Sequence, residues 1–170
     1  MSKYAQGTLA RMIEVALAEV GTVEGPKDNE TKYGAFTKRN FLPWCGSYLM
    51  WCAHEAGVSV PDCVSTIDGA NHFKSTNHWF TSPAIGDFVF FDFVNDGKTL
   101  IQHIGMVIRV NQDKSIVTVE GNTSPSGSQA NGGQVMLKTR DLGAKTFVVG
   151  YGRPVYKAPT APTAPTKETP

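Results

Sequence analysis

The spacing of hydrophobic residues changes once along this chain, at Ser82-Pro83. Before that point, apolar residues recur at steps of three and four, which predicts amphipathic helices. After it come short runs of β-branched and aromatic residues separated by Gly, Asn, Asp and Ser, which predict antiparallel strands. These predicted strands cover residues 88–93, 101–110, 116–120, 134–138 and 147–151. Helices followed by strands favour an α+β fold, with N-terminal helices packed on an antiparallel β-sheet.

Three segments of the first half are predicted to be helical. Residues 9–20 carry one apolar stripe, which predicts a core-packing helix that ends at Gly21. A second helix is expected between Pro43, a residue type favoured at helix starts, and Gly57, a residue type favoured just after helix ends. A third and looser helical segment is expected at residues 66–74.

The chain has 170 residues, the size of one ordinary domain, and we assign residues 1–156 to that domain. The remaining residues, 157–170, read KAPTAPTAPTKETP. Repeated Ala-Pro-Thr cannot bury a core and should form an extended, semi-rigid spacer. It is either a linker that leads to a second, missing domain or a disordered tail.

Charge and hydropathy exclude several classes of protein. The net charge is +1 and no segment is strongly basic, so we expect no nucleic-acid partner. No run of about 18 apolar residues occurs, so we expect no membrane span. The first residues, MSKYAQGTLARMIEV, lack the order of a secretory signal. We therefore expect a protein that is made in the host cytoplasm without a signal peptide. We also expect it to be a monomer.

The three cysteines are Cys45, Cys52 and Cys63. They are too few for a disulfide scaffold. The first two would lie roughly 10 Å apart on one helix, beyond the ~7 Å limit for a disulfide. Cys45 falls at the predicted start of the second helix, where free N–H groups and the helix dipole stabilise a thiolate and an oxyanion. The alternative is that Cys45 is a small buried hydrophobic residue, which is the interpretation we prefer for the other two.

A cysteine nucleophile needs a base, and His103 is the best placed of the four histidines. It opens the predicted strand HIGMVIRV, and Gly105, the next residue on the same face, leaves space beside the imidazole. We expect His54, His72 and His78 to lie at the surface, on a helix or in the loop-rich middle of the chain.

Two polar residues at the end of the next predicted strand, Glu120 and Asn122, could orient that imidazole. Strict alternation would point both side chains to one face. In a hairpin their strand would lie about 5 Å from the strand of His103. A third group of this kind sets the tautomer of a catalytic histidine. The alternative for a carboxylate in this position is a solvated strand end.

Metal binding has weak support in the sequence. No CxxC, HxxxH or HExxH spacing occurs, so we expect no zinc site. The acidic segment with Glu24, Asp28 and Glu30 lacks the D-x-D-x-D-G order of an EF-hand, and a solvated loop is the favoured interpretation. We expect no required cofactor, with calcium at Asp28 and Glu30 left as an alternative.

Taken in order, the segments PWCGSYLMWCAHEAG, GDFVFFDF, QHIGMVIRV and VEGNTS resemble the CHAP family of cysteine, histidine-dependent amidohydrolases/peptidases. The resemblance covers roughly residues 9–155 and implies a papain-like α+β fold. It also implies roles for the residues that match the motifs. They are Cys45 as nucleophile, His103 as general base, Glu120 as orienting acid, Asn122 as a further orienting or oxyanion-side group, and Asp87 as a structural residue.

The resemblance also implies the substrate, which is bacterial peptidoglycan. Relatives cut either the N-acetylmuramoyl–L-alanine amide or a peptide bond of the stem or cross-bridge, and many are phage endolysins with a linker and a wall-binding module. Some bind calcium in the loop before the nucleophile, which EGPKDNETKYG only partly resembles. The alternatives are a bacterial autolysin or small-amide hydrolase of the same fold, and an inactive wall-binding module.

Overall fold

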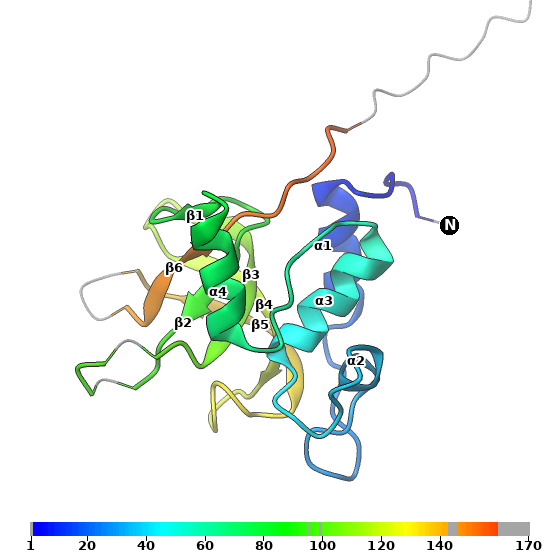
Figure 1. Ribbon diagram of the computed structural model, residues 1–170, viewed down its shortest axis with the longest axis vertical. Helices are drawn as coiled ribbons and strands as arrows, with labels where there is room; N and C mark the ends of the chain where they lie inside the picture. The colour runs from blue at the N-terminus through cyan, green and yellow to red at the C-terminus, as the bar shows by residue number, and fades with distance from the viewer. Residues whose placement is uncertain (1, 95, 99, 143–145, 160–170) are drawn as a thin grey trace, which may run out of the picture.

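The structure of the protein is a computed structural model that describes residues 2–94, 96–98, 100–142 and 146–159 (Figure 1). The helices are α1 (Leu9–Ala18), α2 (Lys32–Phe36), α3 (Cys45–Ala56) and α4 (Thr66–Ser75). The strands are β1 (Trp79–Phe80), β2 (Phe88–Phe91), β3 (His103–Val110), β4 (Ile116–Thr123), β5 (Gln134–Arg140) and β6 (Val148–Gly152). Helices precede strands along the chain, and the predicted α+β fold is confirmed.

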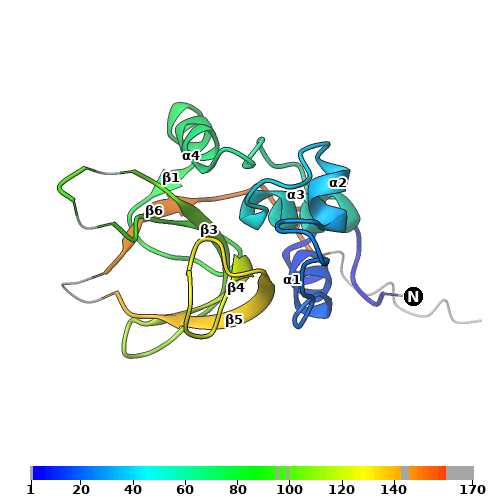
Figure 2. The ribbon, with the colours of Figure 1, turned by 90° about the horizontal axis from the view of Figure 1, so that it is seen from below.

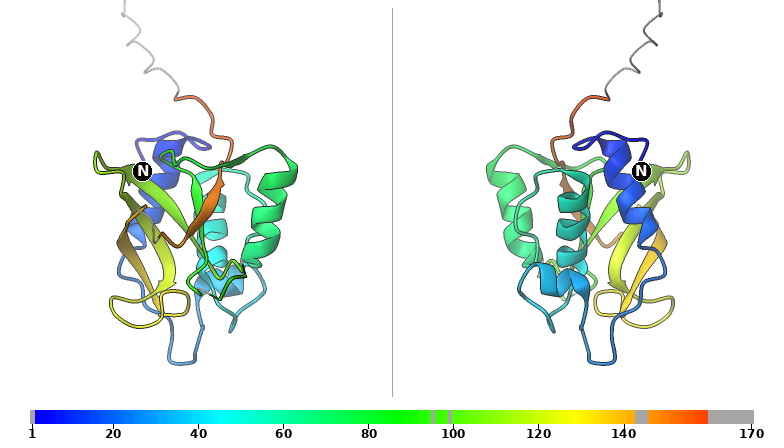
Figure 3. Two further views of the ribbon diagram at one scale, coloured as in Figure 1. Left: turned by 90° about the vertical axis from the view of Figure 1, so that its left-hand side faces the viewer. Right: turned by 90° about the vertical axis from the view of Figure 1, so that its right-hand side faces the viewer.

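The strands form one sheet in the order β1-β6-β2-β3-β4-β5, and every neighbouring pair is antiparallel. Figure 2 shows α1, α2 and α3 gathered at one side of the sheet, with α4 over its β1–β6 end. Helix α3 packs against β3 and β4 and also contacts α1 and α2. It lies between α1 and α4 in both views of Figure 3. The sheet order therefore brings the start of α3 close to the strands that carry the predicted base and acid.

Helix α3 is held against its surroundings by close backbone contacts. A Cβ on Gly46 would lie 1.8 Å from the carbonyl oxygen of Cys63, so only glycine fits at this position. A Cβ on Gly121 would likewise lie 2.7 Å from Cβ of Tyr48. The helix ends at Gly57, whose φ of 68° is left-handed, as the sequence predicts.

Both faces of the central strand β2 are buried, because alternate side chains join different clusters. Phe88 and Phe90 belong to the main core under the helices, together with Ile104 and Met106 of β3. The second cluster, on the other face, contains Val89, Phe91, Val107, Ile116 and Tyr151. A sheet buried in this way gives its inward side chains fixed positions.

The strand bounds shift by a few residues from the predicted ones, and larger differences occur at α1, α2 and β1. Helix α1 ends at Ala18, so Val20 lies outside it and is 41% exposed. No helix was predicted between residues 21 and 43, but this segment contains α2, whose N-cap residue Thr31 accepts a hydrogen bond at its hydroxyl from the N–H of Gly34. Strand β1 was not predicted, since two residues are too few to show a periodic pattern.

The end of the domain is tied to its beginning. Lys157 donates its backbone N–H to the carbonyl oxygen of Gly7, and a β-bridge joins it to Thr8. The repeated Ala-Pro-Thr segment lies almost entirely at residues 160–170, outside the described residues. No helix in the described part of the chain is both long enough and apolar enough to cross a membrane.

Candidate active site

Cys45 is the first residue of α3 and is 2% exposed. The residue before it, Trp44, occupies the N-cap position, and no side chain in the described part of the chain caps the helix there. The indole of Trp44 instead donates to Glu24 at 3.1 Å and stacks on Tyr33. The N–H groups of the first turn are thus left for another acceptor beside the Cys45 sulfur.

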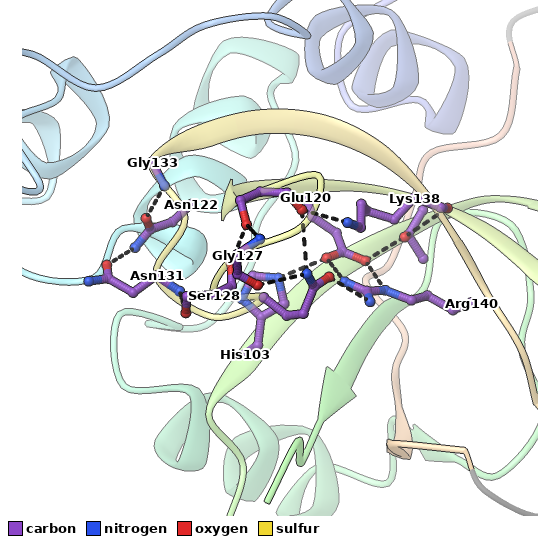
Figure 4. A network of polar contacts seen from close by, with 12 residues as sticks. His103, Glu120, Asn122, Gly127, Ser128, Asn131, Gly133, Lys138 and Arg140 are labelled. Carbon is purple, nitrogen blue, oxygen red and sulfur yellow. Dashed lines mark hydrogen bonds and ion pairs between the residues drawn. The ribbon is translucent and has the colours of Figure 1, made fainter.

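His103 is the first residue of β3 and is fully buried. Its Nε2 lies 2.9 Å from Oε2 of Glu120 (Figure 4). Its Nδ1 is buried and has no hydrogen-bond partner of good geometry within the described residues. The ring also interacts with the side chain of Cys45. One nitrogen is therefore occupied by the carboxylate, which leaves the other for the thiol.

The surroundings of His103 favour its protonated form. Burial lowers the pKa of the imidazole, but the interaction with the nearby Cys45 side chain and the hydrogen bond to Glu120 outweigh burial and raise the pKa to about 9. The imidazolium is thus the favoured form at neutral pH, and it can donate a proton from each ring nitrogen.

Glu120 is fully buried but has a donor on every side. Its oxygens accept from Thr118 Oγ1 at 2.6 Å, from Arg140 Nε at 2.9 Å and from Arg140 Nη2 at 2.6 Å. Burial raises the pKa of the carboxyl, but the hydrogen bonds from His103 and Arg140 lower it to about 2. Glu120 is therefore ionised at any pH where the protein would work.

Gly105 provides space, as predicted, but mainly for a different neighbour. A Cβ at this position would lie 2.7 Å from Cγ of Glu120. The sequence predicted space beside the imidazole, whereas the side chain in contact is that of the carboxylate. Gly105 therefore lets Glu120 lie across β3 and reach His103.

Asn122 lies near Glu120 in sequence, but its amide points to the loops. Its Oδ1 accepts from the N–H of Gly133 at 3.0 Å, and its Nδ2 donates to Asn131 at 2.9 Å (Figure 4). The Nδ2 atom also donates to Asn29 at 3.2 Å. The sequence predicted that Glu120 and Asn122 point to one face of the sheet, which requires side chains to alternate without interruption along β4. A bulge lies between Glu120 and Thr123, and Asn122 has a φ of 56°, which changes the direction of its side chain.

The other cysteines and histidines lie where the sequence predicts them, except His78, which was expected at the surface and is half-buried. Cys52 and Cys63 are buried free thiols, and burial raises the pKa of each. His54 and His72 are exposed. His78 is half-buried, with Nδ1 3.1 Å from the carbonyl oxygen of Arg153.

The described side-chain contacts of Asp28 and Asp87 do not include Cys45, His103 or Glu120. Asp28 is exposed and accepts a hydrogen bond from Asn29. The described residues contain no group of three or more His, Cys, Asp or Glu that could hold a metal ion, and calcium at Asp28 and Glu30 stays a prediction. Asp87 is buried and paired with Arg153 through two contacts of 2.7 and 2.8 Å. Its contacts fit the structural role predicted for it.

Two residues of the site were missed from the sequence, Thr118 and Arg140. Thr118 lies two positions before Glu120 on the same strand, so alternation could have indicated it. Arg140 is the last residue of β5, beyond the predicted end of that strand. Arg140 is the register partner of Ile116 on β4, and its side chain extends to Glu120 on the same strand. The sequence does not reveal this register.

Comparison with known proteins identifies the family of this chain. A family model described as CHAP domain matches residues 37–122, about half of the chain, a range that includes Cys45, His103, Glu120 and Asn122. None of the curated proteins matches significantly. A solved Staphylococcus aureus protein described as similar to lipoprotein, NLP/P60 family, aligns with a TM-score of 0.45 and 15% identity. The alignment covers 92% of this chain but 45% of that one, so the chain spans less than half its length.

Proposed function

Because this chain belongs to the CHAP domain family, we propose that it is a peptidoglycan hydrolase that cleaves an amide bond of the bacterial cell wall with Cys45 as nucleophile. The observation that carries the proposal is the state of the His103 ring. Its Nε2 is bound to Glu120, while its Nδ1 is buried without a partner among the described residues. An orphaned ring nitrogen next to a cysteine at a helix start is the arrangement that thiol activation requires.

The proposed reaction begins with Cys45 as a thiolate and His103 as an imidazolium, whose Nδ1 holds the proton that the thiol has given up. The thiolate sulfur then attacks the carbonyl carbon, and the carbonyl oxygen takes the negative charge. First-turn N–H groups of α3, which no described side chain caps, are suited to stabilise that oxyanion by donating hydrogen bonds to it. The C–N bond breaks as the imidazolium protonates the leaving amine, and a thioester remains on Cys45.

Water completes the cycle. The neutral His103 takes a proton from a water molecule, whose oxygen attacks the thioester carbon. The C–S bond breaks and a carboxylic acid leaves. The proton taken from water stays on His103, so the Cys45 thiolate and the His103 imidazolium are restored. Glu120 keeps Nε2 of His103 in the protonated tautomer throughout, because its carboxylate accepts that hydrogen.

We propose an orienting role for Asn122. The hydrogen bonds of its amide join β4 to residues 29, 131 and 133. Through Asn29, whose carbonyl oxygen accepts from Phe41 N–H at 3.1 Å, these contacts extend to the segment before Cys45. Asn122 would thus shape the rim around the nucleophile, a role these contacts support better than direct oxyanion binding.

We further propose that the protein acts at the cell wall as a phage endolysin, since the family resemblance and the Ala-Pro-Thr segment both fit such an enzyme. The test is to add the purified chain to bacterial walls and to analyse the released fragments by mass. A new carboxyl on the muramoyl lactyl group indicates an amidase, whereas a cut inside the peptide indicates an endopeptidase. Cys45→Ser should abolish release of fragments and should leave the fold intact.

The alternatives make different predictions in the same assay. Intact walls together with hydrolysis of a small amide would replace the endolysin proposal with an amidase of the same fold. Lysis that persists in Cys45→Ser would contradict cysteine catalysis. Binding without cleavage by the natural chain would indicate a wall-binding module. Activity lost in EDTA and restored by Ca²⁺ would establish the calcium alternative at Asp28 and Glu30.

A further inference from the structure

Arg140 is attached to the carboxylate of Glu120 by both arms of its guanidinium. Nε lies 2.9 Å from Oε1 and Nη2 lies 2.6 Å from Oε2, while the arginine side chain is only 13% exposed. Two parallel hydrogen bonds determine the plane of the carboxylate as well as its position. The Oε2 atom held in this way is the one that contacts Nε2 of His103.

The same guanidinium lies against the aromatic rings beside the imidazole. Its central carbon is 5.1 Å from the ring centre of Phe91 and 5.2 Å from that of Phe93, within cation–π range. These two rings are stacked, and their centres lie 5.9 and 5.8 Å from that of His103. Arg140 thus contacts both the carboxylate at one edge of the imidazole and the rings that surround it.

A third contact connects Arg140 to the segment between β4 and β5. Nη1 donates to Oε1 of Gln129 at 3.1 Å, and Gln129 in turn donates to the carbonyl oxygens of Ser124 and Gly127. The side chain is therefore fixed on three sides, by a carboxylate, two rings and a loop. An arginine held only for surface charge would not need such restraint.

We propose that Arg140 is a positioning residue that holds Glu120, and through it the His103 imidazole, in one geometry while His103 gains and loses its proton. The inference rests on the proposed cysteine mechanism. When His103 is neutral, a buried carboxylate with no other cation would be costly and would take up a proton or move. Arg140 supplies a positive charge that is present at each step, so Glu120 stays ionised and in place.

The charge balance gives the direction of the test. The charged and titratable groups around His103 are Cys45 on α3, Glu120 on β4, and Arg140 and Lys138 on β5. Loss of Arg140 removes one positive charge from this group. Deprotonation of His103 would then leave an uncompensated carboxylate, so it should require a higher pH.

The first measurement needs no substrate and therefore tests Arg140 even if the proposed function is wrong. In Cys45→Ser protein, the ring resonance of His103 is titrated by NMR and assigned by its absence in His103→Gln. Arg140→Met should raise the midpoint by about one pH unit or more. Arg140→Lys keeps the charge and should leave the midpoint close to that of the parent protein. Arg153→Met, which breaks the other buried fork, should not move it.

The second measurement is turnover of soluble wall fragments by proteins with Cys45 intact. Arg140→Met should lower kcat about 10- to 100-fold with little change in KM, because a displaced base slows chemistry more than binding. Arg140→Lys should recover part of kcat, since it restores charge but not the two-armed contact. If Arg140→Met fails to fold, Arg140→Lys is tested alone. We then expect a reduced kcat together with an unchanged midpoint of the His103 titration. Natural kcat in both Arg140 variants, or equal losses in Arg153→Met, would overturn the proposal.

Discussion

Among the described residues, two buried carboxylates at the sheet are each paired with an arginine, Glu120 with Arg140 and Asp87 with Arg153. Each carboxylate is at most 1% exposed, and each arginine binds it through Nε and Nη2. They differ in their third partner. Glu120 binds the imidazole of His103, whereas Asp87 accepts the backbone N–H of Ala84. The same ion pair thus orients a titratable ring at one place and fixes backbone at the other.

The surroundings of the two arginines show the same division. Arg140 lies against Phe91 and Phe93, the rings beside His103. Arg153 lies 3.8 Å above the ring centre of Phe80, on the edge strand β1, and is 35% exposed at its side chain. Burial and pairing of a carboxylate therefore do not by themselves indicate catalysis. The third partner of the carboxylate distinguishes the two roles, because it is an imidazole for Glu120 and a backbone N–H for Asp87.

The largest difference between the pairs should appear when each carboxylate becomes an amide. Glu120→Gln keeps the shape but presents an amide that can donate to Nε2, so the imidazole loses its tautomer control and its charge support. We expect kcat to fall at least about 100-fold, a loss of about 3 kcal/mol of transition-state stabilisation. Steady-state turnover of wall fragments measures it. Turnover within threefold of the natural enzyme would show that Glu120 is only structural.

Asp87→Asn should instead affect folding. It leaves Arg153 with a weaker acceptor, and because the Arg153 side chain is 35% exposed we expect the loss of unfolding free energy to lie below the ~3–5 kcal/mol of a fully buried pair. Urea unfolding, followed by circular dichroism, measures that loss. We expect kcat per folded molecule to stay within about threefold, because none of the described contacts of Asp87 reaches Cys45, His103 or Glu120. A fall in kcat comparable to that of Glu120→Gln would remove the distinction between the pairs.

The sequence predicted the parts of the site that depend on local signals. Pro43 and Gly57 delimited α3, so the place of Cys45 at its start could be predicted. Alternation along β3 and adjacency of the next strand were enough to associate His103 with Glu120. The fold class followed from the single change of hydrophobic period.

The parts that the sequence did not predict depend on strand register. The bulge after Glu120 turned Asn122 toward the loops, and bulges leave little trace in a hydrophobic pattern. The pairing of β4 with β5 follows a connection of residues 124–133, too long for turn chemistry to set its register. The sequence therefore could not predict that Arg140 is a partner of Glu120.

The pH dependence of stability should separate the pairs by a smaller amount. The pKa of Glu120 falls from 4.5 to about 2 on folding, so its contribution is complete above pH 4.5 and is lost as pH falls toward 2. The pKa of His103 rises from 6.5 to about 9, so its contribution is complete below pH 6.5 and is lost as pH rises toward 9. Each contribution is about 3 kcal/mol at most, and they overlap because the groups share one interaction.

Urea unfolding between pH 5 and 10 measures the alkaline loss. Glu120→Gln should reduce it, because His103 no longer faces a carboxylate, while Asp87→Asn should keep it in full. A loss that persists unchanged in Glu120→Gln would mean that another group titrates in this range.

The smallest effect is expected at an exposed pair of the same chemistry, Arg39–Asp62. Its atoms approach to 2.6 Å, as close as Arg140 and Glu120, but its side chains are 45% and 50% exposed. Water and salt screen such a pair, so Arg39→Ala should change unfolding free energy by about 0–1 kcal/mol and leave kcat unchanged. Urea unfolding at low and high salt measures this, and any small loss should vanish in high salt. A loss as large as that of Asp87→Asn would show that distance rather than burial sets the strength of these pairs. If the loss is small, distance cannot explain the difference, because the Arg39–Asp62 and Arg140–Glu120 distances are equal. Burial and the third partner of the carboxylate would then account for the different strengths of the three pairs.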